Sequence, residues 1–311
     1  MLWLAVTISF YFILSIVFLV DKYLLTSSIP NPKFYTFFVG SLGILVLIIV
    51  PFVDFYIPEI SQIILALLAG AIFIYALFWF YKSLFLFETS RVVPAISALV
   101  PLFTFFLVYI FSKGKEVLPP LGFLAFILLI FGSVLMVIER EKFINLKSFK
   151  ISIISAFLLS LSFVFMKYVY LVQPFWNGFI WIRLGGVLMA VLFLFFVRDI
   201  REKVLKKREI TASLRAQDRD YKTAVIFLLN QAAGAGANVL QNWAFALAPL
   251  AYIAVINALQ GTQYVFLLIL TVFLSLKFPQ ILKEEISREI IFQKIIAILL
   301  IAGGLTILAI F

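Results

Sequence analysis

The chain has 311 residues, of which 65% are hydrophobic and 13% are charged, with a mean hydropathy of +1.17 and a net charge of +10. A soluble protein of this size carries about 25% charged residues, so the composition indicates an integral membrane protein without a separate soluble domain. The chain has no Cys and no His, which excludes disulfides, thiolate sites and most zinc or haem chemistry. We therefore expect no cofactor and no metal.

Apolar stretches of membrane-spanning length follow one another along almost the whole chain. About 20 residues of helix cross a hydrocarbon core of ~30 Å. Backbone groups in lipid must be paired within the segment, and runs such as Leu42–Val53 lack the alternation of barrel strands, so we predict helices. The ten predicted spans are Leu2–Val20, Phe34–Val53, Ser61–Tyr81, Val92–Phe111, Val117–Ile138, Ile151–Leu171, Asn177–Val197, Thr223–Leu247, Ala251–Leu274 and Ile295–Phe311. The first is too long for a cleavable signal and has no basic residues before it.

Two stretches in the two halves of the chain align with each other. Ser97–Phe106 reads SALVPLFTFF and Asn257–Phe266 reads NALQGTQYVF. A residue that distorts helices, Pro101 or Gly261, has the same place in each stretch. Pro101 lies in the middle of the fourth span and should kink that helix.

Glycines also match between the halves. Gly132 and Gly304 have corresponding places in the fifth and tenth spans. We therefore predict an all-α membrane protein of ten transmembrane helices, built from two five-helix repeats, residues 1–144 and 145–311. An odd number of spans in each repeat makes the copies antiparallel, as inverted-repeat transporters require.

Basic residues gather in alternate connections between the spans. Almost all of the 25 Lys and Arg residues follow the first, third, fifth, seventh and ninth spans. The positive-inside rule then places these connections in the cytoplasm and both termini outside the cell. The basic loop Arg198–Lys222 and the segment Pro279–Lys294 are expected to lie on the anionic cytoplasmic face of the plasma membrane. The charge therefore indicates a lipid bilayer as partner and not a nucleic acid.

Only Lys167 and Arg183 carry a charge inside the predicted spans. A charge in hydrocarbon costs about 2.5–3.5 kcal/mol on insertion scales, so it is rarely there without a task. Arg183 either faces a cavity and holds a carboxylate or phosphate with its planar fork, or serves as a structural clamp or reaches the interface. Lys167 lies one turn from the end of the sixth span, where snorkelling is favoured over contact with a substrate.

Amide side chains are concentrated in the eighth and ninth spans. In a bilayer these groups need hydrogen-bond partners, which come either from neighbouring helices or from a substrate. Eight amides in two neighbouring helices are more than helix packing usually needs, so a polar lining for a substrate is favoured. These amides are Asn230, Gln231, Asn238, Gln241, Asn242, Asn257, Gln260 and Gln263, all but Gln231 being candidate substrate-binding residues.

Three weaker features complete the candidates. Tyr75 and Trp79 in the third span are candidates for stacking on a ligand, although anchoring at the interface is the more common role. The small-residue run Ala232–Ala237 (AAGAGA) indicates close helix packing. Glu88 and Arg91 flank the turn into the fourth span, where we expect them to pair.

The stretch Tyr75–Val137 resembles an EamA domain of the drug/metabolite transporter superfamily. The shared features are an Ala-Leu in the third span, a short turn, the mid-helix Pro101, the sequence Gly114-Lys115-Glu116 and a Gly-containing fifth span. The second half resembles a diverged copy that lacks the mid-helix Pro and the Gly-Lys-Glu. The resemblance implies an inner-membrane carrier for small metabolites that works by alternating access around a central cavity. Well-known relatives are usually drawn with cytoplasmic termini, opposite to the charge distribution here.

The leading hypothesis is a transporter for a small polar or zwitterionic metabolite. Small multidrug pumps of the same superfamily use a membrane-embedded Glu for proton exchange, and no such acid lies in the spans here. The alternatives are a flippase for a phosphorylated lipid carrier, held by Arg183 and Lys167, and a non-transporting receptor or scaffold. An enzyme would need a nucleophile with a base, paired carboxylates or a metal, so we do not expect one. The sequence favours no particular oligomeric state.

Overall fold

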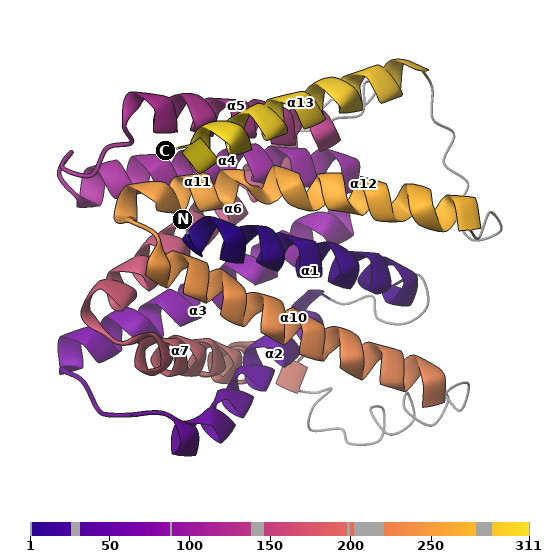
Figure 1. Ribbon diagram of the computed structural model, residues 1–311. Coiled ribbons are helices and arrows are strands. Elements are labelled where there is room, and N and C mark those ends of the chain that lie inside the picture. Colours follow the sequence, from indigo (N-terminus) through magenta and orange to yellow (C-terminus); the bar gives the residue numbers. More distant parts are fainter. Residues whose placement is uncertain are drawn as a thin grey trace.

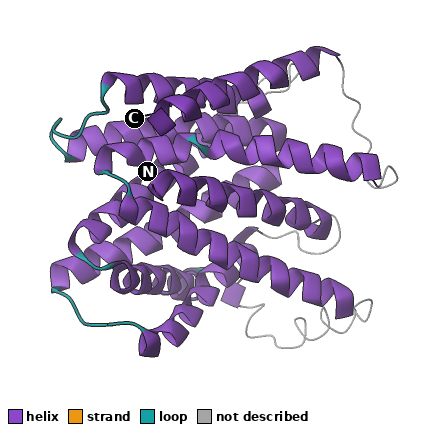
Figure 2. Ribbon diagram, viewed as in Figure 1, coloured by secondary structure: helices purple, strands orange, loops and turns teal. Residues whose placement is uncertain are grey.

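The computed structural model describes residues 2–25, 32–87, 89–137, 146–197, 200–201, 221–277 and 288–310. These residues form long helices that run along one another, and no strand occurs among them (Figures 1 and 2). The helices are α1 (Leu2–Leu25), α2 (Pro32–Leu42), α3 (Ile60–Leu86), α4 (Thr89–Phe111), α5 (Pro120–Val137), α6 (Leu146–Val172), α7 (Phe175–Phe196), α10 (Tyr221–Leu247), α11 (Ile253–Ala258), α12 (Gln260–Lys277) and α13 (Arg288–Ile310), with 3₁₀ helices η1 (Gly43–Phe52) and η2 (Leu250–Tyr252).

Seven of the described helical segments are long and apolar enough to cross a membrane. They are Leu2–Val20, Ile60–Leu86, Pro120–Val137, Phe149–Val172, Phe175–Phe196, Leu250–Phe273 and Phe292–Ile310. The predicted multi-pass, all-helical membrane protein is therefore confirmed. The second and fourth predicted spans contain the shorter apolar helices Thr36–Phe52 and Ala95–Phe111, and the eighth coincides with α10, which its amides make less apolar.

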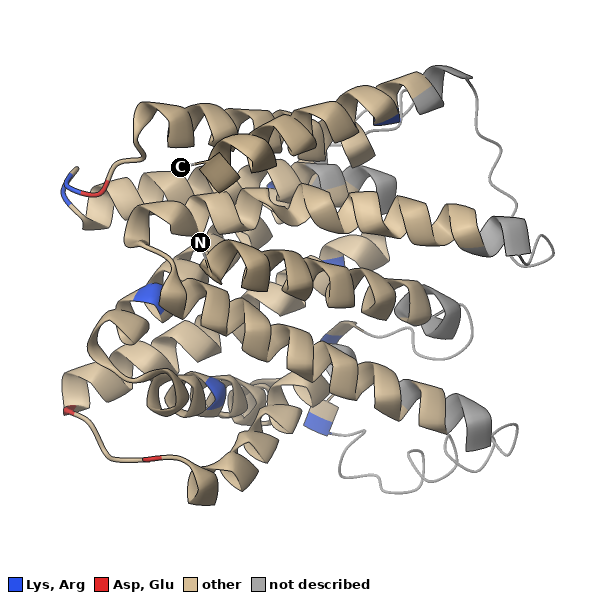
Figure 3. Cartoon of the chain, in the orientation of Figure 1, with Lys and Arg blue, Asp and Glu red and all other residues tan. Residues whose placement is uncertain are grey.

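The outer surface of the bundle is as apolar as its interior. Large side chains such as Ile48, Phe196 and Leu299 are exposed, while others fill the contacts between helices. Charged residues are sparse along the described helices and lie mainly near their ends (Figure 3). A helix that is apolar all round is stable in lipid and not in water, so these outer faces contact the membrane.

Helices from distant parts of the chain pack side by side. α3 lies along α6 and α7, α1 along α10 and α12, and α5 along α13. Serines of α6 hold this arrangement with hydrogen bonds to backbone carbonyls of neighbouring helices. Ser162 Oγ donates to Ala69 O at 2.8 Å, and Ser160 Oγ donates to Val100 O at 2.9 Å. Such bonds satisfy hydroxyl groups that would otherwise be unpaired in the bilayer.

The longer described loops lie at one end of the bundle, the end nearer the marked chain termini (Figure 2). They comprise residues 53–59, 112–119, 173–174 and 248–249. We call this the terminal end and the other the opposite end. The expected Glu88–Arg91 pair, and most of the segments 198–222 and 279–294, lie outside the described residues.

Two predicted spans are not regular α-helices. The second changes from α2 into the 3₁₀ helix η1, and the ninth is interrupted at Leu259, between α11 and α12. Two donors from other helices stabilise this interruption. Tyr11 Oη donates to Ile256 O at 3.0 Å, and Ser133 Oγ donates to Ala258 O at 3.0 Å. The distortion expected at Gly261 thus occurs two residues earlier, while α4 continues as one helix through Pro101.

Candidate functional site

A chain of four polar side chains crosses the interface between α6, α7 and α10. Tyr170 Oη donates to Asn242 Oδ1 at 2.8 Å, and Asn242 Nδ2 donates to Asn238 Oδ1 at 3.0 Å. The same Asn238 oxygen accepts a hydrogen bond from Arg183 Nη2. Because Asn238 and Asn242 are one turn apart on α10, they face the same gap. The structure therefore brings three predicted residues together and adds Tyr170.

The Arg183 guanidinium is held in place by neutral groups among the described residues. Its hydrogen-bond partner Asn238 is a neutral amide, and its carbon Cζ lies 5.1 Å from the centre of the Phe179 ring. A cation over an aromatic face is attracted to it. Among the described residues no Asp or Glu forms an ion pair with Arg183. Since a guanidinium has five N–H donors, most of its capacity to bind an anion is left over.

A small pocket of about 10 Å³ lies against this network. Its lining includes Arg183, Asn238 and Asn242, together with residues of α2, α3 and α6. This volume admits about one water molecule, so the described conformation is closed to any metabolite.

Close approach of α3 to α7 shapes this pocket. A Cβ atom on Gly70 would collide with the carbonyl oxygen of Ile182, the residue before Arg183. On the other side of α7, a Cβ on Gly43 would lie 3.2 Å from the Arg183 carbonyl oxygen. Glycines at these two positions let neighbouring backbones press against the turn that carries Arg183.

Lys167 has a structural contact. Its side chain is only 3% exposed, and its Nζ donates to Ala246 O at 3.1 Å, near the end of α10. The last carbonyls of a helix lack partners within that helix and attract cations. The sequence favoured snorkelling for Lys167, and in the structure its ammonium binds the backbone near the end of α10. Lys167 does not line the Arg183 pocket.

The amides of α11 and α12 lie apart from the Arg183 network. Asn257 Nδ2 donates to Thr104 Oγ1 at 2.9 Å, which joins α11 to α4. Gln260 Nε2 donates to the Tyr264 hydroxyl at 3.1 Å, and this hydroxyl shares a hydrogen bond of 2.7 Å with Ser97 Oγ. These amides therefore connect helices within the bundle, at least in this conformation.

The remaining predicted amides have three different surroundings. Gln263 is 2% exposed, and its Oε1 has no hydrogen-bond partner among the described residues. Asn230 is buried and has a partner. Gln241 is half-buried and lines neither of the two described pockets. Of the small-residue run next to Asn238, Ala237 is buried, while a Cβ on Gly236 would meet nothing within 4 Å.

Tyr75 and Trp79 belong to an aromatic cluster on another part of α3. The Tyr75 ring lies 6.3 Å from the Trp79 ring and 6.4 Å from that of Phe193 on α7. Lys82 Nζ lies 4.5 Å from the centre of the Trp79 ring. Neither Tyr75 nor Trp79 lines a described pocket, so the structure does not bring them to Arg183.

Sequence reasoning missed the residues that bond to the amides. Tyr170, Ser97 and Tyr264 were not singled out, because tyrosine and serine are frequent in membrane helices. A signal did exist for two of them, since Ser97 and Tyr264 lie in the two aligned stretches. Among the described residues, no group of three or more His, Cys, Asp or Glu side chains gathers as a metal site would require.

Comparison with known proteins gives a fold and no family. No protein-family model matches the chain, and no curated protein sequence matches it. Eighteen chains of solved structures do match. One of them, described only as "Crystal structure of protein", superposes with a TM-score of 0.61 over 99% of this chain and 96% of its own. At 15% identity this likeness shows a shared fold over the whole chain and nothing about function.

Proposed function

We propose that the chain is a secondary transporter for a small polar or zwitterionic metabolite, with Arg183 binding an acidic group of the solute. The observation that carries this proposal is the guanidinium inside the bundle, held by the neutral Asn238 and without a carboxylate partner among the described residues. A structural arginine would be expected to pair with an acid or with backbone carbonyls. Tyr170 and Asn242 add groups that orient a polar solute.

Ten spans in two inverted repeats, and with them the EamA resemblance, are part of this proposal. Contacts between α5 and α13 support it. A Cβ on Gly132 would lie 2.7 Å from Ile301 and 3.0 Å from Ala297 O. A Cβ on Gly304 would lie 2.8 Å from Leu129 and 3.1 Å from Ala125 O. Positions 125, 129 and 132 of α5 differ from positions 297, 301 and 304 of α13 by the same number of residues. Each helix therefore offers the same set of positions to the other, as in a contact across a two-fold axis.

Hydrogen bonds between α4 and the α11–α12 pair support the same symmetry. In the alignment of the two stretches, Ser97 corresponds to Asn257, and Thr104 corresponds to Tyr264. The structure has a hydrogen bond between Ser97 and Tyr264 and another between Asn257 and Thr104. Exchanging the two repeats converts one bond into the other. The packing of whole helices shows the same correspondence. Exchanging the repeats replaces α3 by α10 and α6 by α1, and both the α3–α6 pair and the α10–α1 pair are in contact.

The different depths of these two bonds in the bundle support alternating access. α4 runs from the opposite end at Thr89 to the terminal end at Phe111. The Ser97–Tyr264 bond is therefore nearer the opposite end, and the Asn257–Thr104 bond is nearer the terminal end. In the proposed mechanism each bond closes one side of the bundle, and the solute passes when they open in turn.

The proposed orientation in the plasma membrane follows the charge distribution. At the opposite end the described charged side chains include Lys33, Lys82, Lys150 and Lys294, and no described acidic side chain accompanies them. The loops of the terminal end carry Asp54, Glu59 and Glu116 beside Lys113 and Lys115. By the positive-inside rule, the opposite end faces the cytoplasm and both termini face outward.

Counterflow in liposomes tests the transport proposal. The purified protein is reconstituted and screened with amino acids, organic anions, sugars and nucleotides, beside Arg183→Ala and a control with Lys113→Ala in an exposed loop. We expect saturable exchange of one class of acidic or zwitterionic solute, loss of that exchange in Arg183→Ala, and normal exchange in the control.

Other outcomes change the assignment. Exchange that persists in Arg183→Ala would leave a carrier but remove Arg183 from the binding site. If the folded protein exchanges no solute yet moves a fluorescent phospholipid between leaflets, the flippase alternative is correct. If it does neither, a receptor or scaffold role replaces transport.

A further inference from the structure

A second pocket shares no lining residue with the pocket beside the Arg183 network. It measures about 30 Å³ and is surrounded by α1, α3, α4 and α12. Its polar lining is Ser97, Gln260, Gln263 and Tyr264, and its apolar lining comes from Phe18, Phe80, Val93 and Ile96. A cavity of this size holds one or two water-sized particles. It is therefore a site for an ion or a small group, and not for a metabolite.

One buried hydrogen-bond acceptor in this pocket is unpaired among the described residues. The Gln263 Oε1 atom is buried and has no partner among the described residues. Gln260 donates its amide to the Tyr264 hydroxyl, so its own oxygen is left as an acceptor. Pro101 has no N–H to donate to the carbonyl of Ser97, one turn earlier on α4. The pocket thus holds one unpaired buried oxygen, with the side-chain oxygens of Gln260, Ser97 and Tyr264 among its lining residues.

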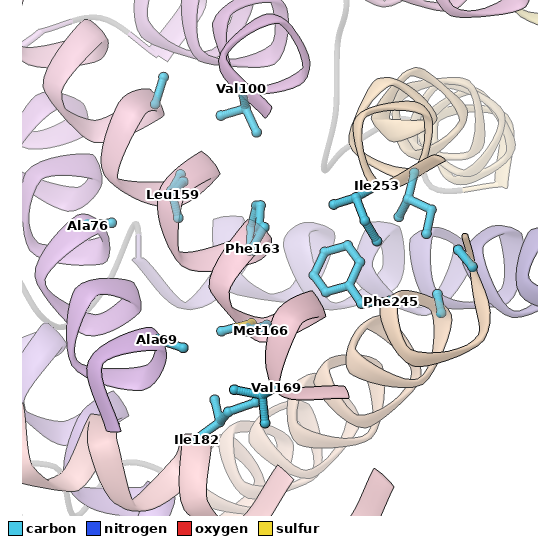
Figure 4. Close-up of a cluster of buried hydrophobic side chains, with 14 of the residues drawn as sticks. Ala69, Ala76, Val100, Leu159, Phe163, Met166, Val169, Ile182, Phe245 and Ile253 are labelled. Carbon is cyan, nitrogen blue, oxygen red and sulfur yellow. The ribbon is translucent and has the colours of Figure 1, made fainter. Parts of the chain in front are cut away.

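The corresponding place in the other repeat is filled by apolar side chains. In the alignment of the two stretches, Val100 takes the place of Gln260 and Phe103 takes the place of Gln263. Val100 is buried in a cluster with Phe163 and Ile253, and Phe103 packs against that cluster (Figure 4). If Gln260 and Gln263 served only to hold α4 against α12, amides would be expected at the corresponding positions of the first repeat as well. Their presence on one side alone points to a ligand.

We propose that this pocket binds a desolvated monovalent cation, Na⁺ or K⁺, through neutral oxygen atoms. No charged side chain is among the residues that line it, whereas divalent cations generally require carboxylates. Amide and hydroxyl oxygens can replace the hydration shell of a monovalent ion. The lining residues of α12 directly follow the interruption at Leu259.

The role of this cation rests on the proposed transport function. An ion bound between α1, α4 and α12 would couple its own gradient to movement of the solute, because it contacts the crossing that opens and closes. The cation would then couple an ion gradient to transport, as a membrane-embedded Glu does in small multidrug pumps. Binding of the cation itself does not depend on transport and can be measured separately.

Thermal unfolding of the purified protein tests the site. The midpoint is measured in NaCl, KCl and choline chloride at equal ionic strength. We expect a saturable rise of at least about 2 °C in Na⁺ or K⁺ relative to choline, because a ligand of the native state stabilises it. Gln263→Met keeps the volume and removes the acceptor, so it should abolish the ion-dependent rise. Gln241→Met, which changes a half-buried amide outside both pockets, should retain it.

Two results would overturn the site. Equal midpoints in all three salts would show that no monovalent cation binds, and Gln263→Met would then raise the midpoint in every salt by removing an unpaired amide. An ion-dependent rise that survives in Gln263→Met would place the ion elsewhere.

Arg183→Ala separates this inference from the proposed function. The variant should keep the ion-dependent rise while losing counterflow. If wild-type protein shows the rise but no counterflow, the site stands and transport fails. If counterflow occurs without any effect of Na⁺ or K⁺ on unfolding or on flux, transport stands and the cation site fails.

Discussion

Arg183 is positioned by a neutral amide and an aromatic ring. Insertion of an arginine at mid-membrane costs about 2.5–3.5 kcal/mol, and contact with a ring returns about 0.5–2 kcal/mol of this. The bond to Asn238 orients the guanidinium but leaves its charge in place. A bound carboxylate would therefore gain more from Arg183 than it would from an arginine that is already paired.

Replacing Asn238 with Asp should convert this arrangement into an ion pair. The new carboxylate would compete with an acidic solute for Arg183, and charge pairs of this kind are worth ~1.5 kcal/mol or more. We expect the KM for the solute to rise by at least about tenfold while the unfolding midpoint increases. Asn238→Ala keeps the charge of Arg183 free and should weaken transport less. Wild-type KM in Asn238→Asp would contradict a binding role for Arg183.

Lys167→Met tests the structural interpretation of the second intramembrane charge. The substitution removes the bond to Ala246 O and also removes a buried ammonium, and these two effects oppose each other. We expect the free energy of unfolding to change by no more than about 2 kcal/mol. Counterflow per folded molecule should be unchanged, measured beside Arg183→Met. A loss of transport equal to that of Arg183→Met would place Lys167 in the solute path.

At the scale of elements, close backbone contact between α3 and α7 holds the Arg183 turn. Gly70→Ala should separate the two helices, because the added Cβ would overlap the Ile182 carbonyl. Overpacking typically costs about 1–3 kcal/mol, and we expect a fall of that size in the free energy of unfolding. Gly236→Ala is the matched control, since its Cβ meets nothing within 4 Å. It should be neutral or stabilise α10 by up to about 1 kcal/mol. Chemical denaturation in detergent compares them.

The helices could be predicted from the sequence, whereas the exact position and type of their irregularities could not. Apolar runs such as Ile60–Leu86 and Phe175–Phe196 are long enough to identify a span without any knowledge of neighbours. The 3₁₀ stretch Gly43–Phe52 is equally apolar, and Pro51, near its end, does not by itself indicate 3₁₀ geometry over the whole stretch. The interruption at Leu259 depends on donors from α1 and α5, which are far away in sequence.

The candidate site shows the same limit at the level of side chains. The sequence identified Arg183, Asn238 and Asn242 as polar residues in an apolar setting, and the structure brings them together. The sequence could not tell which amides face Arg183 and which join other helices, because that depends on how α10 and α12 are rotated about their axes. Tyr170 was missed for this reason, since only the packing of α6 against α10 gives its hydroxyl a role.

At the scale of the whole molecule, the two bonds between α4 and α11–α12 should have opposite effects on access. Thr104→Val removes the bond nearer the terminal end, and Tyr264→Phe removes the one nearer the opposite end. The chain has no Cys, so single cysteines report on each end. Ala248→Cys, at the terminal end, and Ser83→Cys, at the opposite end, replace buried residues of similar size.

Labelling by a water-soluble thiol reagent measures the two equilibria. Thr104→Val should speed labelling at position 248 and slow it at position 83, and Tyr264→Phe should do the reverse. Loss of one hydrogen bond changes an equilibrium by about 0.5–1.5 kcal/mol, so rates should shift about two- to tenfold. Thr306→Val, whose hydroxyl bonds only within α13, is the control. Changes in the same direction at both ends would mean loosening of the bundle and not alternation.

The self-complementary glycine contact of α5 and α13 has a consequence for assembly. Gly132 fits against α13 as Gly304 fits against α5, so the information for docking is present in each half of the chain. Residues 1–144 and 145–311, produced as two separate polypeptides, should then insert with opposite topologies and find each other, and an affinity tag on one should recover both. The covalent link between the two halves would then set their ratio and orientation. The contact surfaces of α5 and α13 would be what makes the halves bind each other.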